Sequence, residues 1–142
     1  IDGGDIMMVG DHYYIGLSER TNLEGAKQII KILKKYDMSG STISLKKVLH
    51  LKTSLSYLEK NNLVVSGEFI NDSSFGQYNS IEIPEKESYA ANCIWVNESV
   101  IIPLGYPTTK QRIENAGYPV IETDVSEFQK LDGGLSCLSL RY

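Results

Sequence analysis

The sequence predicts an α/β fold assembled from repeated units, each with a hairpin, a helix and a further strand. Hairpin signals, in which Gly, Asp or Asn separates two short apolar runs, occur three times along the chain. They recur at intervals of roughly 35–50 residues, which is typical of repeat architectures. Hydrophobic residues make up 42% and charged residues 23%, as in ordinary globular domains. Neighbouring units of this kind bury each other's apolar faces.

The first unit is predicted over about residues 5–47. Its turn is Gly10-Asp11, because both residue types tolerate the positive φ of a tight hairpin turn. Thr21 and Glu24 have capping-box spacing, which predicts the start of a helix. Gly40 is expected to close the unit before its last strand. The expected elements are strands 5–9, 13–17 and 42–45 and a helix over 23–36.

The second and third units are predicted over about residues 54–84 and 91–122, followed by a tail over 123–142. A capping box from Thr108 to Gln111 predicts a helix that Gly117 ends. The stretch 82–87 is rich in Glu and is expected to be a solvated loop. The remaining expected elements are strands 54–58, 63–65, 80–83, 92–96, 100–102 and 118–121 and a weak helix over 68–73.

Charge and composition exclude several function classes. The net charge of −4 argues against a nucleic-acid-binding surface. No apolar run approaches the roughly 20 residues that span a bilayer. Two cysteines do not make a disulfide framework, so the cytoplasm is the expected compartment. The sequence begins at Ile1 without an initiator Met, and no unit resembles a terminal cap, which predicts a longer parent protein.

Cys137 is a candidate nucleophile, because the preceding Gly133 and Gly134 allow a backbone to approach a ligand closely. The alternative is a small buried hydrophobic residue, and the spacing alone favours that interpretation. Cys93 lies within an apolar strand and is expected in the core.

His50 follows a strand signal, where functional residues often collect, and would serve Cys137 as a proton shuttle. Asp2 would supply the carboxylate that orients it, although a plain acidic turn residue is the simpler interpretation. Arg20 precedes the first helix and would bind a carboxylate in a bidentate ion pair. No metal-binding spacing, P-loop or dinucleotide fingerprint is present, so no metal or cofactor is expected.

Five segments occur in a specific order: Asp2-Gly3-Gly4-Asp5-Ile6, Gly16–Asn22, Leu49–Lys52, Ala90–Ile94 and Asp132–Cys137. Together they resemble the dimethylarginine dimethylaminohydrolase family, which belongs to the arginine deiminase superfamily of guanidino-modifying enzymes. The resemblance covers the whole chain and corresponds to the C-terminal part of that family's enzymes. It implies a pentein-type α/β-propeller built of ββαβ units, with about three of five units present.

The resemblance also implies roles for particular residues. Cys137 corresponds to the nucleophile and His50 to the general acid and base, while Asp2 stands where the family usually has Glu. Arg20 corresponds to an arginine that binds the substrate's α-carboxylate. The carbonyl of Leu131 and the carboxylate of Asp132 correspond to groups near the substrate amine.

The implied reaction is the hydrolysis of asymmetric dimethylarginine to citrulline and dimethylamine through a thiouronium on Cys137. The implied partners are a methylated arginine and the N-terminal part of the same enzyme, with no nucleic acid, no membrane and a possible homodimer. The isolated chain is expected to be inactive, because the resemblance puts the guanidinium-binding carboxylates outside it.

Two alternatives remain open. Arginine deiminases have His-x-Asp, whereas this chain has Lys52 at the third position of that motif, which favours a methylated substrate. The second alternative is a non-catalytic fragment, against which the retained Cys137 and His50 argue.

Overall fold

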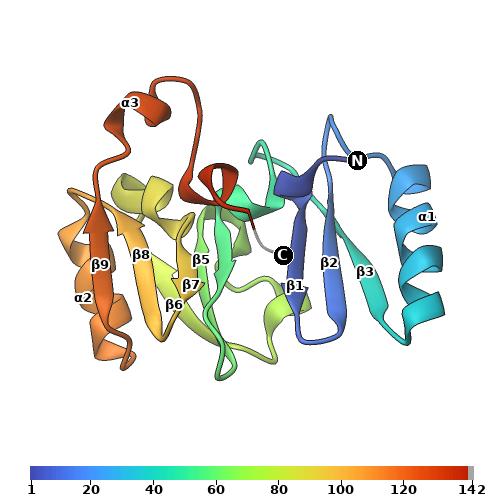
Figure 1. Cartoon of the computed structure of the whole chain (residues 1–142), viewed down its shortest axis with the longest axis horizontal. Helices are drawn as coiled ribbons and strands as arrows, with labels where there is room; N and C mark the ends of the chain where they lie inside the picture. Colours follow the sequence, from blue (N-terminus) through green and yellow to red (C-terminus); the bar gives the residue numbers. More distant parts are fainter. Residues whose placement is uncertain (141–142) are drawn as a thin grey trace. The chain divides into compact units, whose positions relative to one another are not determined.

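The computed structural model describes residues 1–140, and the chain forms two compact units (Figure 1). Unit 1 is Ile1–Lys52 and unit 2 is Thr53–Tyr142. Arg141 and Tyr142, which belong to the predicted tail, lie outside the described residues. Among residues 1–140, no helix has both the length and the apolarity to cross a bilayer.

Unit 1 is a three-stranded sheet of strand order β1-β2-β3 with one helix (Figure 1). Strands β1 and β2 are antiparallel, and β2 and β3 are parallel. The parallel pair requires a crossover, which α1 provides. The elements are β1 (Ile6–Val9), β2 (His12–Leu17), α1 (Leu23–Leu33) and β3 (Ser39–Ser44).

The start of α1 differs from the predicted capping box. Asn22 is the N-cap, and its side chain accepts a hydrogen bond from the Gly25 amide at 2.8 Å. Thr21 instead turns its hydroxyl to Asp5, at 2.6 Å. The prediction for Gly40 is also wrong, because it lies within β3. A Cβ there would lie 3.0 Å from Ile30 Cγ1, so glycine permits the close packing of α1 on the sheet.

Unit 2 contains two three-stranded sheets, β4-β5-β6 and β7-β8-β9, which repeat the antiparallel-then-parallel order of unit 1. Its main core joins side chains of both sheets, including Val64, Ile83 and Ile102, to Ile113 of α2. The elements are β4 (Leu55–Tyr57), β5 (Asn62–Ser66), β6 (Asn79–Ile83), β7 (Ile94–Val96), β8 (Ser99–Pro103), α2 (Pro107–Asn115), β9 (Val120–Thr123) and α3 (Ser126–Gln129).

The helix predicted over 68–73 is absent. Two 3₁₀ turns, Gly67–Phe69 and Ser73–Phe75, connect β5 to β6. Asn71 between them has a left-handed φ of 63°, which interrupts a helix. Phe69 and Phe75 are buried and meet edge to face, with 5.9 Å between ring centroids. Aromatic packing therefore replaces the missing helix at this crossover.

The prediction of a solvated loop over 82–87 is wrong at Glu87. This residue is buried in a 3₁₀ helix, η6 (Glu85–Ala91). Its carboxylate accepts the amides of Thr108 at 3.2 Å and Thr109 at 2.7 Å, and the Thr109 hydroxyl at 2.9 Å. These amides are in the first turn of α2, which begins at Pro107 rather than with the predicted Thr108–Gln111 box. Glu87 therefore caps α2 from a distant part of the chain.

Glu87 predicts a pH-dependent contribution to stability. Burial alone would raise the pKa of its carboxyl, but the hydrogen bonds from Thr108 and Thr109 lower it below its ordinary value of 4.5. A lowered folded-state pKa stabilises the protein above the ordinary value, and this contribution is lost as the pH falls. Glu87→Gln should reduce the free energy of unfolding at pH 7 by about 1–2 kcal/mol.

Urea unfolding across a pH series checks this prediction. The difference between Glu87→Gln and the parent should shrink as the pH falls below 4.5. Glu85→Gln is the control, because Glu85 is exposed on the same 3₁₀ helix. A difference that stays constant from neutral to acid pH would contradict the role of the Glu87 charge.

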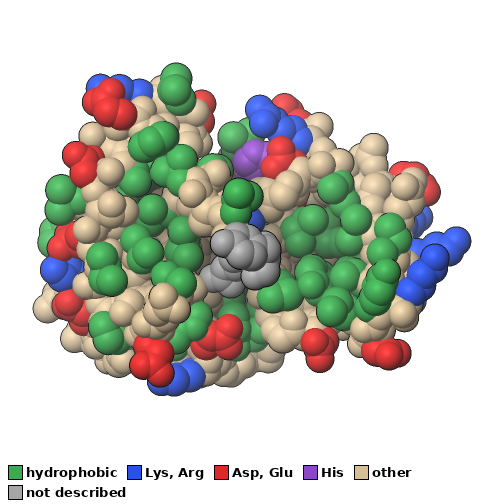
Figure 2. Space-filling view, in the orientation of Figure 1, with side chains coloured by type: hydrophobic (Ala, Val, Ile, Leu, Met, Phe, Trp, Pro, Cys, Tyr) green, Lys and Arg blue, Asp and Glu red, His purple; other side chains and the backbone are tan. Residues whose placement is uncertain are grey.

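Figure 2 shows hydrophobic side chains gathered over the β1–β3 sheet and over β8 and β9. Large hydrophobic side chains are also exposed in each unit. Contiguous apolar surface of this kind is typical of contact faces. Those of unit 1 include Met8, Leu23, Ile32 and Tyr36, and those of unit 2 include Val96, Leu104, Ile121 and Phe128.

Candidate active site

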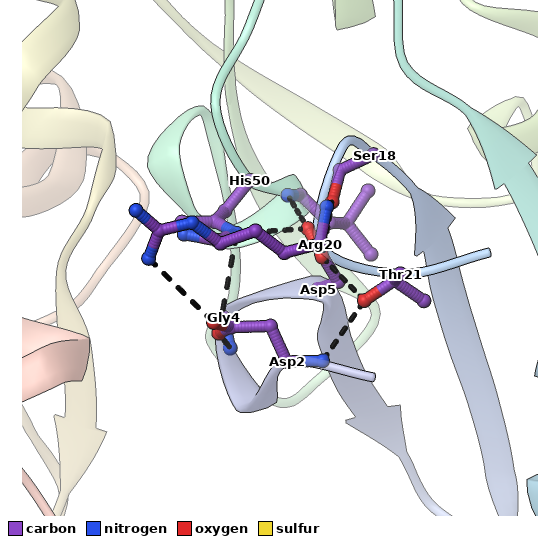
Figure 3. Close-up of polar contacts among 8 residues, drawn as sticks. Asp2, Gly4, Asp5, Ser18, Arg20, Thr21 and His50 are labelled. Atoms are coloured by element: carbon purple, nitrogen blue, oxygen red, sulfur yellow. Dashed lines mark hydrogen bonds and ion pairs between the residues drawn. The ribbon is translucent and has the colours of Figure 1, made fainter. Parts of the chain in front are cut away.

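His50 is held in unit 1 by a buried carboxylate (Figure 3). The His50 Nδ1 lies 3.1 Å from Asp5 Oδ1, and Asp5 is fully buried. Asp5 Oδ1 also accepts the Leu51 amide at 3.2 Å. Asp5 Oδ2 accepts the hydroxyls of Ser18 and Thr21, each at 2.6 Å. Asp5, in the turn before β1, thus joins the strand ends of unit 1 to His50.

This network favours an ionised Asp5. Burial would raise the pKa of its carboxyl, but hydrogen bonds from Ser18, Thr21, His50 and the Leu51 amide together lower it. An ionised Asp5 can accept Nδ1–H of the imidazole and leave Nε2 to exchange a proton. The His50 side chain is only 12% exposed, so its orientation is restricted by its surroundings.

Asp2, the carboxylate proposed from the sequence, lies farther from His50. Its Oδ1 is 4.0 Å from Nδ1, and it accepts the Gly4 amide at 2.8 Å. Its other oxygen, Oδ2, lies 3.9 Å from Arg20 Nη1 (Figure 3). A Cβ at Gly4 would lie 2.9 Å from His50 Cγ, so the glycine lets this turn lie against the ring. The structure thus gathers Asp2, Arg20 and His50 and adds Asp5.

Cys137 lies in unit 2, on the 3₁₀ turn Leu135–Leu138. It is a free, exposed cysteine, so the alternative interpretation as a small buried hydrophobic residue is wrong. Its amide donates to the Gly134 carbonyl at 3.0 Å, which closes the turn. An exposed thiol on a tight turn is accessible to a ligand.

Cys93, in contrast, is a core residue, as predicted. It is 5% exposed and belongs to the main core of unit 2. Burial raises the pKa of its thiol to about 12. A thiol with that pKa holds almost no thiolate at neutral pH and is a poor nucleophile.

The two cysteines should therefore differ sharply in reactivity. With iodoacetamide at pH 8, Cys137 should be alkylated at least roughly 100-fold faster than Cys93 in the folded chain. Peptide mass spectrometry after timed quenching measures both rates in one sample. Denaturation in urea should make the two rates similar, and fast folded-state alkylation of Cys93 would contradict the assignment.

The segment before Cys137 is shaped by backbone hydrogen bonds. The amides of Leu131 and Gly133 donate to the Phe128 carbonyl, each at 3.0 Å. Asp132 adopts a left-handed φ of 58°, and the Leu131 side chain is 85% exposed. Leu131 and Asp132 thus lie on an exposed turn a few residues before Cys137. Within residues 1–140, no group of three or more His, Cys, Asp or Glu is placed to hold a metal ion.

The sequence profile of the arginine deiminase family matches residues 1–88, more than half of the 142-residue chain. The chain belongs to the arginine deiminase family. Within it, the N(G),N(G)-dimethylarginine dimethylaminohydrolase of Pseudomonas aeruginosa is 63% identical over 142 residues, which are 100% of this chain and 56% of that protein. The chain spans about half the length of the curated relatives it matches.

Two solved structures have a closely similar fold. A cysteine-to-serine variant of the Pseudomonas aeruginosa enzyme complexed with citrulline gives a TM-score of 0.95 at 63% identity, covering 98% of this chain and 55% of that one. A cyanobacterial arginine dihydrolase domain bound to its product gives 0.85 at 26% identity, covering 97% and 54%. The predicted α/β-propeller fold class is confirmed, while the number of units in the whole protein stays a prediction.

Proposed function

We propose that the chain supplies the nucleophile and the acid–base group of an enzyme that hydrolyses asymmetric dimethylarginine to citrulline and dimethylamine. The observation that carries this proposal is the Asp5–His50 hydrogen bond at 3.1 Å, in a chain whose whole length matches a dimethylarginine dimethylaminohydrolase. The exposed thiol of Cys137 supplies the nucleophile.

The proposed reaction has two halves. The Cys137 thiolate attacks the guanidinium carbon, because a thiolate is nucleophilic enough for a carbon whose charge three nitrogens share. The C–N bond to the dimethylated nitrogen breaks, and His50 donates the proton with which dimethylamine leaves. The neutral imidazole then takes a proton from water, whose oxygen attacks the thiouronium. Collapse releases citrulline and returns the thiol.

Arg20 and the turn before Cys137 are the proposed binding groups for the amino-acid end of the substrate. The Arg20 side chain is 62% exposed, and its nearest carboxylate, that of Asp2, lies 3.9 Å away. A substrate carboxylate can therefore form a bidentate ion pair with the Arg20 guanidinium. The Leu131 carbonyl and the Asp132 carboxylate are proposed to bind the substrate's ammonium group.

The remaining substrate contacts are proposed to come from the N-terminal part of the same enzyme. That part would carry the carboxylates that bind the guanidinium, and it would cover apolar side chains such as Leu23 and Ile121, which are about half exposed. A second copy of the chain is the alternative occupant of these surfaces. Both Cys93 and Cys137 are free thiols, in keeping with a cytoplasmic enzyme.

The test joins this chain to the N-terminal part of the Pseudomonas aeruginosa relative, to which it is 63% identical. The joined protein should release citrulline and dimethylamine in equal amounts from asymmetric dimethylarginine. The isolated chain should release neither, because misplacing a reacting group by ~1 Å costs on the order of 10²-fold in rate. No citrulline from a folded joined protein would refute the proposal.

Lys52 is expected to contribute to substrate choice. Lys52→Asp restores the His-x-Asp pattern of the deiminases and adds a carboxylate suited to an unsubstituted guanidinium nitrogen. An unmethylated guanidinium nitrogen can donate hydrogen bonds to this carboxylate, whereas a dimethylated nitrogen cannot. A buried acceptor left without its hydrogen bonds costs about 1–3 kcal/mol. The kcat/KM ratio of arginine to asymmetric dimethylarginine should therefore rise roughly 10-fold or more.

The matched control is Lys47→Asp, the same charge change at an exposed position a few residues earlier. Both ratios are measured in the joined protein, by citrulline release from each substrate. An unchanged kcat/KM ratio in Lys52→Asp would show that Lys52 does not contribute to the choice between arginine and asymmetric dimethylarginine.

A further inference from the structure

We propose that Asn92 is a positioning residue that fixes the loop carrying Cys137, with Tyr89 as a second support. The catalytic consequence rests on the function proposed above, whereas the structural consequence can be measured without turnover. All of the contacts involved lie within unit 2.

Asn92 holds the residue directly before the proposed nucleophile. Its Oδ1 accepts the Ser136 amide at 2.9 Å, across 44 residues of sequence. Asn92 is 8% exposed and directly follows η6, between buried Ala91 and Cys93. A buried acceptor on a packed segment gives the loop one fixed attachment point.

Gly134 shows how closely this loop lies against Asn92. A Cβ at Gly134 would lie 2.4 Å from Asn92 Nδ2 and 2.8 Å from its Cγ. The backbone of Gly134 is extended, with φ −108°, which any residue adopts. Glycine is therefore required at this position by the contact with Asn92 and not by backbone conformation.

Tyr89 gives the loop a second attachment. Its hydroxyl donates to the Gly133 carbonyl at 2.7 Å. Burial, and then the charges of Tyr106 and Cys137, raise the pKa of the Tyr89 hydroxyl, so it remains a donor at neutral pH. Tyr89 lies in, and Asn92 directly follows, the 3₁₀ helix that Glu87 ties to α2. The loop is thus joined through η6 to the body of unit 2.

Asn92 is the contact that ties the Ser136 amide itself to the body of unit 2, while Tyr89 holds Gly133 and Leu135 is buried beside it. The Cys137 amide bonds to Gly134 and the Ser139 hydroxyl to Ser136, and both contacts lie within the loop itself. Without Asn92 the loop would keep its turn but lose the attachment next to Cys137, so the thiol would shift more easily. A displacement of ~1 Å at a nucleophile costs on the order of 10²-fold in rate.

Hydrogen exchange at the Ser136 amide tests the structural part in the 142-residue chain. Asn92→Ala should raise that exchange rate roughly 10-fold, because the amide loses its acceptor. Asn92→Asp keeps the acceptor and should leave the rate within about threefold of the parent. Asn62→Ala is the matched control, because it removes another side-chain amide hydrogen bond of unit 2, to the Tyr118 hydroxyl. Exchange unchanged in Asn92→Ala would overturn the proposal.

Gly134→Ala disturbs the contact between Gly134 and Asn92 from the loop side. It tests the role of this contact if Asn92→Ala does not fold. The added methyl should raise exchange at Ser136 roughly as Asn92→Ala does. In the double variant, removal of the Asn92 amide makes room for the methyl, so the two effects should not add. Exchange in Gly134→Ala equal to the parent, or fully additive effects, would overturn the contact's role.

The catalytic part is measured in the joined protein. Asn92→Ala should lower kcat for asymmetric dimethylarginine roughly 10- to 100-fold while KM stays within about threefold, and Asn92→Asp should recover most of kcat. Equal loss in both variants, or a change confined to KM, would contradict positioning of the thiol. A joined protein with no activity at all would refute the proposed function. The hydrogen-exchange rates at Ser136 would still test whether Asn92 fixes the loop.

Discussion

Cys137→Ser in the joined protein is expected to lower citrulline release by more than about 10³-fold. A serine hydroxyl is far less ionised than a thiol at neutral pH, so the covalent step fails although the side chain keeps its size. Because Cys137 is exposed and lies outside the main core, the folding of unit 2 should be unaffected. Steady-state citrulline release and thermal unfolding of the same samples give both quantities.

Cys93→Ser is the matched control for this substitution. It places a hydroxyl in the core of unit 2, where Cys93 is 5% exposed, so it should reduce stability and leave kcat near the parent value. The reverse pattern, in which Cys93→Ser abolishes turnover and Cys137→Ser retains it, would exchange the assignments of the two thiols.

His50→Ala is expected to have the second largest effect, lowering kcat on the order of 10³-fold. The same imidazole is proposed to protonate dimethylamine and then to activate water, so both halves of the reaction lose their proton carrier. A substrate analogue whose leaving group needs no proton, such as an S-alkyl isothiourea that expels an alkylthiolate, should recover the first half only. Pre-steady-state measurement of thiol release then separates the two halves.

The carboxylates near His50 are distinguished by paired variants. Asp5→Asn should reduce kcat more than Asp2→Asn, because Asp5 lies 3.1 Å and Asp2 4.0 Å from the imidazole Nδ1. An amide at position 5 loses the charge that accepts Nδ1–H and fixes the orientation of the imidazole. A larger kcat loss in Asp2→Asn would assign the orienting role to Asp2, as the sequence predicts.

The predicted strands are present in all three sheets, although the one predicted over 42–45 is Ser39–Ser44 and the one predicted over 118–121 is Val120–Thr123. Turn residues such as Gly10-Asp11 and Asn97-Glu98 mark the hairpins, and the apolar runs beside them form the predicted strands. Helix starts were predicted less well, because their capping groups depend on partners elsewhere. Asn22 caps α1 while Thr21 is drawn to Asp5, and Glu87 caps α2 from 3₁₀ helix η6.

The candidate site shows the same division. Cys137 and His50 were identified because each lies in a short segment with a family resemblance. Asp5 and Asn92 lay in those segments too, but their roles depend on contacts 45 and 44 residues away in sequence. The sequence offered one signal for these roles, namely a polar residue directly beside a predicted strand. Asp5, which is buried just before β1, is the example.

The role of Cys137 as nucleophile is tested most directly by the search for a covalent intermediate on its thiol. The joined protein is mixed with asymmetric dimethylarginine, quenched in acid within milliseconds to seconds, digested and analysed by peptide mass spectrometry. An adduct should appear on the peptide containing Cys137 at least as fast as citrulline, and it should be absent in Cys137→Ser. Turnover at the full rate with no adduct on Cys137, or with an adduct that forms more slowly than citrulline, would contradict the role of Cys137 as nucleophile.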